Sequence, residues 1–162
     1  MRRLRTLALS LILAAGALAA VPPALADGKV TWTNIDVPEG DGAAALQKNL
    51  KKLLDKAARK VSFGKAKKVS FSVKVTELVS EQKGDVHRVS CTIVGRIPGG
   101  PSAKSRISFG GSPADKAKLE KQVLTMVANA VVTRLAEIVR SRAAKEARDA
   151  EKASESEQAA GE

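Results

Sequence analysis

The chain has 162 residues and a formal net charge of +11 at pH 7, and only 2% of its residues are aromatic. This length is enough for one domain, and the excess of cations favours anionic partners. The single cysteine, Cys91, excludes an internal disulfide. The few aromatic side chains disfavour a nucleic-acid partner, because single-stranded bases are commonly held by stacking on aromatic rings.

Residues 1–26 have the features of a cleaved secretory signal. Arginines at positions 2, 3 and 5 precede an apolar run from Leu7 to Val21, and Ala24-Leu25-Ala26 supplies the small-x-small cleavage pattern. This run is shorter than the roughly 20 residues that span a bilayer. We therefore expect a mature chain that begins at Asp27, has no transmembrane span and is exported to the periplasm or outside the cell. An uncleaved anchor is the alternative.

The positive charge is unevenly distributed along the chain. Residues 143–162 hold three basic and six acidic residues, so residues 27–142 carry a net charge of +11. A strongly cationic body outside the cytosol favours lipid headgroups, lipopolysaccharide or wall polymers as partners. A charge that serves only solubility is the alternative explanation.

After the signal, the chain is expected to form a strand and then a helix. Apolar residues alternate loosely from Lys29 to Val37, which predicts a strand with a bulge between Trp32 and Ile35. A turn at 38–42, with Asp41 as N-cap, precedes a helix from Gly42 or Ala43 to about Lys60. The apolar stripe of this helix has steps of three and four: Leu46, Leu50, Leu53, Leu54 and Ala57.

Three strands joined by short turns are expected to follow. Residues 69–76 alternate apolar and polar side chains, as a half-buried strand does. The next strand is expected to direct inward Val89, Cys91, Ile93 and Ile97. The last is expected to direct inward Ile107 and Phe109, and outward Lys104, Arg106 and Ser108. Turns at 82–85 and 98–101 favour antiparallel pairing, with a solvated outer face that includes Arg88, Thr92 and Arg96.

The longest periodic segment is a predicted helix from Ser112 to about Arg142. Ser112 is a predicted N-cap, Pro113 suits the first helical position and Asp115 completes a capping box. The apolar stripe comprises Leu119, Val123, Met126, Val127, Val131, Leu135, Ile138 and Val139. A helix of about 45 Å is longer than any of the strands, so it should lie diagonally or extend beyond the sheet. Residues 143–162 are expected to be a charged tail, partly helical and then disordered.

These elements predict one α+β domain over residues 27–142. The order β-α-β-β-β-α indicates a two-layer sandwich, in which two amphipathic helices cover one face of a largely antiparallel sheet. The order resembles periplasmic domains of the anticodon-binding-like type and, in its first five elements, cystatin-like folds. Both resemblances concern topology and transfer no site residues.

The sequence contains no constellation that indicates catalysis. His87 and Cys91 lie on one predicted strand, four residues or about 13 Å apart, which is too far for a direct nucleophile–base pair. Asp85 and His87, with Glu77 and Glu81 nearby, are better explained as turn and strand residues than as a metal site. We therefore expect a non-enzyme with no cofactor and no metal.

The strongest functional signal is a concentration of cations, opposed only by Asp55. It comprises Lys48, Lys51, Lys52, Lys56, Arg59, Lys60, Lys65, Lys67 and Lys68, and Arg88 and Arg96 are expected to lie behind it. We expect an exported accessory or binding domain that docks on an anionic envelope component through these residues, or contacts an envelope protein. An ordinary solvated helix face is the alternative. The rival functions are a secreted enzyme inhibitor using the turns at 82–85 and 98–101, and an oligomeric scaffold using the long C-terminal helix.

Overall fold

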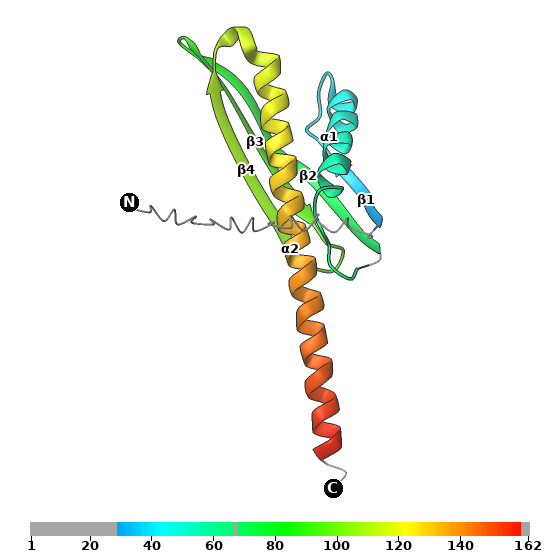
Figure 1. Cartoon of the computed structure of the whole chain (residues 1–162). Helices are drawn as coiled ribbons and strands as arrows, with labels where there is room; N and C mark the ends of the chain where they lie inside the picture. The colour runs from blue at the N-terminus through cyan, green and yellow to red at the C-terminus, as the bar shows by residue number, and fades with distance from the viewer. Residues whose placement is uncertain (1–28, 67, 160–162) are drawn as a thin grey trace, which may run out of the picture.

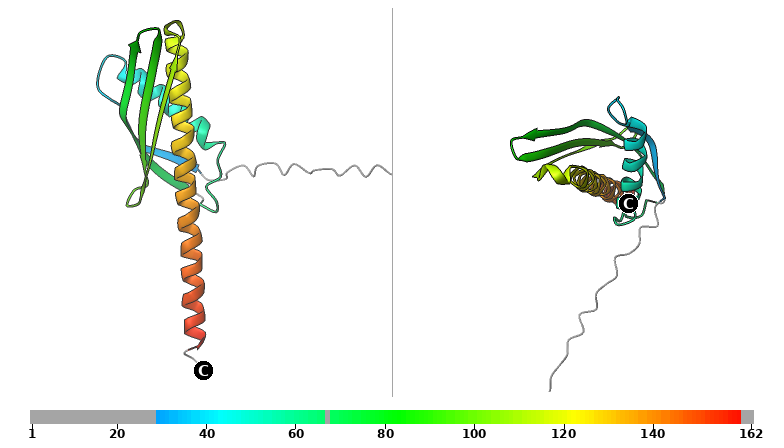
Figure 2. Two further views of the ribbon diagram at one scale, coloured as in Figure 1. Left: turned by 90° about the vertical axis from the view of Figure 1, so that its left-hand side faces the viewer. Right: turned by 90° about the horizontal axis from the view of Figure 1, so that it is seen from above.

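A computed structural model describes residues 29–66 and 68–159 of the chain. The expected signal at residues 1–26, and Lys67, lie outside the described residues. The elements are β1 (Lys29–Asp36), α1 (Ala43–Ala58), β2 (Lys68–Lys83), β3 (Val86–Arg96), β4 (Ser102–Gly111), a short 3-10 helix (Pro113–Asp115) and α2 (Lys116–Ala159). Both helices pack on one face of the sheet, which confirms the predicted α+β two-layer sandwich (Figures 1 and 2).

The described sheet has the strand order β1-β2-β3-β4. β1 is parallel to β2, with α1 as the crossover, and the other two pairings are antiparallel. Residues 84 and 85 form a two-residue hairpin turn between the paired Lys83 and Val86. Gly84 has a φ of 58°, the left-handed conformation that glycine adopts without a steric penalty.

Two irregularities set which side chains face the helices. The register of β1 and β2 shifts between Trp32 and Asn34, which confirms the predicted bulge. A second shift, between Val75 and Glu77, places Glu77 opposite Thr92 and turns Leu78 toward the core. A bulge inserts one residue and reverses the alternation beyond it. β2 therefore continues to Lys83 after the point where its apolar alternation breaks.

The core lies between the sheet and the buried stripe of α2. Val123, Val127, Val131 and Leu135 are fully buried there. Gly95 of β3 permits the close approach, since a Cβ at this position would lie 2.8 Å from the Leu135 side chain. Aliphatic packing therefore fixes α2 on the sheet, as the low aromatic content predicts.

Three local predictions are wrong. The N-cap of α1 is Gly42, with a φ of 93° and no side-chain bond, because the turn ends one residue after Asp41. Thr92 is only 2% exposed, because Glu77 covers it on the outer face. Phe109 is 40% exposed, although its position on β4 has the predicted inward parity.

α2 is longer than predicted. Ser112 caps its 3-10 start by accepting from the Ala114 amide, as expected, but the helix continues to Ala159 and extends beyond the sheet (Figures 1 and 2). The prediction of disorder gave too little weight to local interactions that stabilise a helix in this segment. It is rich in alanine and in charged helix formers, and opposite charges recur four residues apart, as in Arg142 with Glu146 and Lys145 with Asp149.

One helix of the described chain, over Pro113–Ser154, is long and apolar enough to cross a membrane, with a mean hydropathy of 1.3 in one window. The same residues supply much of the core. Val123, Val127 and Val131 pack against the sheet and have no exposed surface. The apolar character of α2 is therefore accounted for by the packing of the domain.

Candidate anionic-surface binding site

α1 separates an apolar face from a cationic face. Leu50, Leu54 and Ala57 are buried. The side chains on the other side of the helix are exposed: Lys48, Lys51, Lys52 and Lys56. Burial of the leucines fixes the rotation of the helix about its axis, so the four ammonium groups must face solvent. This much of the predicted site has the geometry that the helical spacing requires.

The segment after α1 adds exposed cations on a fixed backbone. Arg59, Lys60, Lys65 and Lys68 are exposed, and Lys67 lies outside the described residues. Phe63 is buried from the same segment, with its ring centroid 5.7 Å from that of Phe71 in β2. Arg140 of α2 also donates to the Ser62 carbonyl at 3.3 Å. These contacts hold the cationic segment against the domain.

The cations of α1 and of the following segment have a single acid among them. The only carboxylate between residues 48 and 68, Asp55, accepts from the Trp32 indole nitrogen at 2.7 Å. Within the described residues the ion pairs are Lys83–Glu81 and Arg106–Glu77, both on the sheet. The positive potential of this surface is therefore not cancelled by neighbouring side chains.

The structure does not bring Arg88 and Arg96 to this surface. Both are exposed, and they share the outer sheet face with Thr92, whereas α1 lies on the covered face. They are also eight residues apart on β3, a distance of about 26 Å. Arg88 lies opposite Glu81 in the register, and Arg96 lies opposite Ser72. The predicted set therefore separates into one clustered surface and two isolated arginines.

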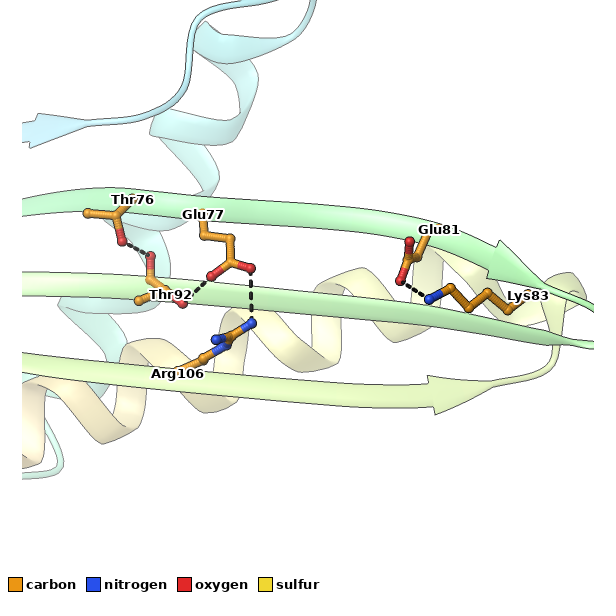
Figure 3. A network of polar contacts seen from close by, with 6 residues as sticks. All are labelled: Thr76, Glu77, Glu81, Lys83, Thr92 and Arg106. Atoms are coloured by element: carbon orange, nitrogen blue, oxygen red, sulfur yellow. Dashed lines mark hydrogen bonds and ion pairs between the residues drawn. The ribbon is translucent and has the colours of Figure 1, made fainter.

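The outer sheet face contains a paired polar network (Figure 3). Glu77 accepts from the Thr92 hydroxyl at 2.9 Å and from the Arg106 guanidinium at 3.1 Å. Thr76 donates to the Thr92 carbonyl at 3.3 Å, and Lys83 lies 3.5 Å from Glu81. Part of the charge on this face is therefore satisfied locally, unlike the charge of α1.

A His87–Ser80–Glu120 chain joins the sheet to α2, with the serine in the middle, whereas a catalytic triad places the histidine between serine and carboxylate. Ser80 donates to Glu120 at 2.8 Å, so it accepts at its 2.9 Å contact with Nε2 of the buried His87. An activated serine must instead give its proton to the histidine. Sequence reasoning missed this chain, because the register shift that turns Ser80 inward is not visible in the alternation.

The remaining chemical candidates are buried or dispersed. Burial, and secondarily the charge of Glu77, raise the pKa of the Cys91 thiol to about 11, so the thiolate is scarce at neutral pH. In the described parts of the chain, no group of three or more His, Cys, Asp or Glu side chains is placed to hold a metal ion.

Two hollows flank the cationic face of α1. One, of about 560 Å³, lies against α2 and includes Lys52 with Leu46 and Leu53. The other, of about 400 Å³, lies against β1 and includes Lys48 and Lys51. The cations therefore border concave surfaces on both sides of the helix.

Comparison with known proteins does not assign the chain to a family. No protein-family model matches it, and no curated protein matches it in sequence. Several solved structures resemble it. The PelC dodecamer of Paraburkholderia phytofirmans is 18% identical, with a TM-score of 0.43 over 69% of this chain and 92% of that chain. A Caulobacter crescentus CB15 protein described as a lipoprotein is 12% identical, with a TM-score of 0.41 over 69% and 90%.

The third is a minor lipoprotein of Acinetobacter baumannii, which is 16% identical, with a TM-score of 0.31 over 75% of this chain and 95% of that chain. Two of these three chains are described as lipoproteins. At such identities and TM-scores the likeness carries no argument about binding or activity.

Proposed function

We propose that this chain is an exported, non-catalytic binding domain that docks on an anionic surface of the cell envelope. The observation that carries the proposal is the unbalanced charge of α1 and the segment after it. Eight described cations are exposed there, and the one carboxylate among them is bonded to Trp32. Long-range attraction to an anionic surface needs such a local excess of one sign.

The order of the His87–Ser80–Glu120 hydrogen bonds supports a function without chemistry. The hydroxyl proton of Ser80 is committed to Glu120, and Cys91 is buried with a raised pKa. Neither side chain is prepared to act as a nucleophile. Export rests on the signal pattern of residues 1–26 and is tested by identifying the N-terminus of the protein recovered from cells.

The experiment is co-sedimentation of the full mature chain with three purified surfaces over a salt series. The surfaces are phosphatidylglycerol vesicles, lipopolysaccharide aggregates and cell-wall polymer. We expect binding to at least one of them at low salt and its loss at high salt, because the screening length falls from about 10 Å at 0.1 M to about 3 Å at 1 M. Absence of binding at every salt concentration contradicts the proposal.

Two variants locate the binding surface. Charge reversal at Lys51, Lys52 and Lys56 should lower the affinity on the order of a hundredfold, since each cation near an anionic bilayer contributes about 1 kcal/mol. The comparison variant reverses Arg88 and Arg96 on the opposite face of the sheet. It should bind nearly as the parent chain does. Equal losses in both variants would indicate attraction by net charge alone.

A second candidate function, that of a scaffold, is favoured by the protruding part of α2. Residues 140–159 extend about 30 Å, and the side chains from Arg140 to Ser154 are all exposed. Analytical ultracentrifugation tests this function by comparing the full chain with one ending at Arg142. Association that depends on concentration and disappears on truncation supports a scaffold, and monomers in both samples contradict it.

A further inference from the structure

A groove of about 610 Å³ runs between the start of β4 and α2. Pro101, Ser102, Ala103 and Lys104 form one wall. Successive residues of a strand direct their side chains to opposite faces, so a wall of four consecutive residues is the strand's edge, where the backbone is accessible. The opposite wall consists of α2 residues at steps of three, four and one: Arg134, Glu137, Ile138, Ser141, Arg142 and Lys145.

The backbone of β4 at this groove has no strand beside it, because β4 is the last strand of the described sheet. The Arg134 guanidinium donates to the Lys104 carbonyl, which therefore points outward. The Pro101 carbonyl instead accepts from Ile97 at 3.3 Å, on the side of β3. Backbone groups alternate in this way along an antiparallel strand, so Ser102 shares the outward direction of Lys104.

The groove is cationic, and its two arginines are held in place. Lys104, Arg134, Arg142 and Lys145 line it with a single carboxylate, Glu137, and none of the four cations belongs to an ion pair in the described residues. The Arg142 guanidinium lies against the β3–β4 turn, where a Cβ at Gly100 would be 2.6 Å from it. Arg134 is fixed by its bond to β4. Eight residues of helix separate the two, a rise of about 12 Å.

We propose that this groove binds an extended acidic segment of a partner protein, which adds as a strand to the free edge of β4. Residues four apart in an extended segment lie on the same face, about 13 Å from each other. Two carboxylates at that spacing match the separation of Arg134 and Arg142. The partly exposed Ile138 provides apolar surface for a side chain between them.

Arg134 couples charge recognition to strand pairing. In the free protein its guanidinium donates to the Lys104 carbonyl. This bond protects the free edge of β4 against pairing with unrelated strands. An incoming carboxylate offers the guanidinium a stronger, charge-assisted partner. The released carbonyl then accepts a backbone N–H of the segment. This inference is independent of the proposed docking through α1.

The test uses a fluorescein-labelled synthetic peptide in which glutamate alternates with valine, a residue that favours extended backbone. Its affinity for the full mature chain is measured by fluorescence anisotropy. One comparison peptide replaces glutamate by glutamine, and another keeps glutamate but carries methylated backbone nitrogens. We expect both to bind at least roughly tenfold more weakly. Absence of binding by the acidic peptide, or equal binding of either comparison peptide, overturns the proposal.

Protein variants test the residues of the groove. Arg134→Glu with Arg142→Glu should abolish peptide binding, whereas Arg148→Glu with Lys152→Glu, which makes the same charge change on the exposed tail, should alter it less than about threefold. Ser102→Pro removes an outward N–H from an edge strand, where proline is tolerated, and should weaken binding severalfold. Thermal unfolding checks that each variant is folded. Equal losses in the groove and tail variants overturn the assignment.

A second copy of this chain is the competing occupant, since its tail is acidic. That occupant predicts self-association in sedimentation velocity runs, abolished by Arg134→Glu with Arg142→Glu and reversed by excess acidic peptide, which competes for the same groove. Such a result overturns the proposal of a partner protein. A monomer that binds the peptide supports it.

Discussion

The cationic face of α1 and the protruding part of α2 are both exposed helical surfaces with several basic residues, but their charges are balanced differently. In α1 a single acid, Asp55, opposes four lysines, so the helix carries an excess of positive charge. In residues 143–154 of α2, Lys145, Arg148 and Lys152 alternate with Glu146, Asp149 and Glu151. α1 therefore presents a net positive potential, whereas residues 143–154 present nearly none.

The difference follows from what stabilises each helix. α1 buries Leu50 and Leu54, so its stability comes from packing and its outer face is free to carry like charges. The tail buries nothing between Arg140 and Ser154, so its helix depends on propensity and on opposite charges three and four residues apart. Packing therefore permits an unbalanced surface where a self-supporting helix does not.

The largest expected effect is on stability, and it should differ between the packed half of α2 and its exposed half. Leu135→Ala should lower the free energy of unfolding by about 3 kcal/mol, because it leaves a cavity in a fully buried site. Ala150→Pro should melt the tail yet change that free energy by less than about 0.5 kcal/mol. Denaturant unfolding with circular dichroism measures both. A large loss of domain stability in Ala150→Pro would show that the tail is coupled to the core.

Cys91 predicts a loss of stability in alkaline solution. The fully buried thiol has a pKa of about 11, against an ordinary 9.0, so the folded chain keeps a proton that the unfolded chain loses. Raising the pH from about 9 to 11 should therefore lower the free energy of unfolding by up to about 3 kcal/mol. At neutral pH the thiol is protonated in both states and has no such effect. Cys91→Ala should remove this part of the pH dependence, as measured by urea unfolding at each pH. Parallel curves for the two proteins would contradict the assignment.

Replacement of Asp55 should lower stability by a smaller amount and should strengthen docking on an anionic surface. Asp55→Asn weakens a charge-assisted bond to Trp32 and should cost about 1 kcal/mol. Because the tryptophan is unique, its emission reports the change directly. The variant should also bind anionic surfaces more tightly, since the last negative charge on α1 is removed. Weaker binding would show that Asp55 takes part in the contact.

Ser105 should give the smallest effect. Its buried hydroxyl has no hydrogen-bond partner in the described residues, so Ser105→Ala removes an unsatisfied polar group. The free energy of unfolding should rise by up to about 1 kcal/mol in thermal or denaturant unfolding. A loss of stability would indicate a partner for the hydroxyl, such as a buried water molecule.

The elements could be predicted from the sequence wherever a periodic pattern reached the core. The stripes of α1 and α2, and the bulge after Trp32, follow from spacing alone, so the lysines of α1 were also placed correctly on its exposed side. The bulge after Val75 could not be located, since several shifts are compatible with the apolar pair Leu78 and Val79. Phe63 was missed as an anchor, because a single aromatic residue in a basic segment belongs to no periodic pattern.

The arrangement of surfaces depended on information that spacing does not contain. Alternation correctly predicts Arg88 and Arg96 on the sheet face away from α1, but it does not tell how far they lie from the α1 cations. The groove beside β4 requires both the strand order and the path of α2 across the sheet. Neither follows from the local sequence of the residues that line it.

The most direct test of the central claim compares two variants of equal net charge on the surface that the parent chain binds. One carries Lys51→Glu, Lys52→Glu and Lys56→Glu on α1, and the other carries Lys145→Glu, Arg148→Glu and Lys152→Glu on the tail. Co-sedimentation at low salt should show a loss on the order of a hundredfold for the first and less than about threefold for the second. Equal losses would contradict docking through α1.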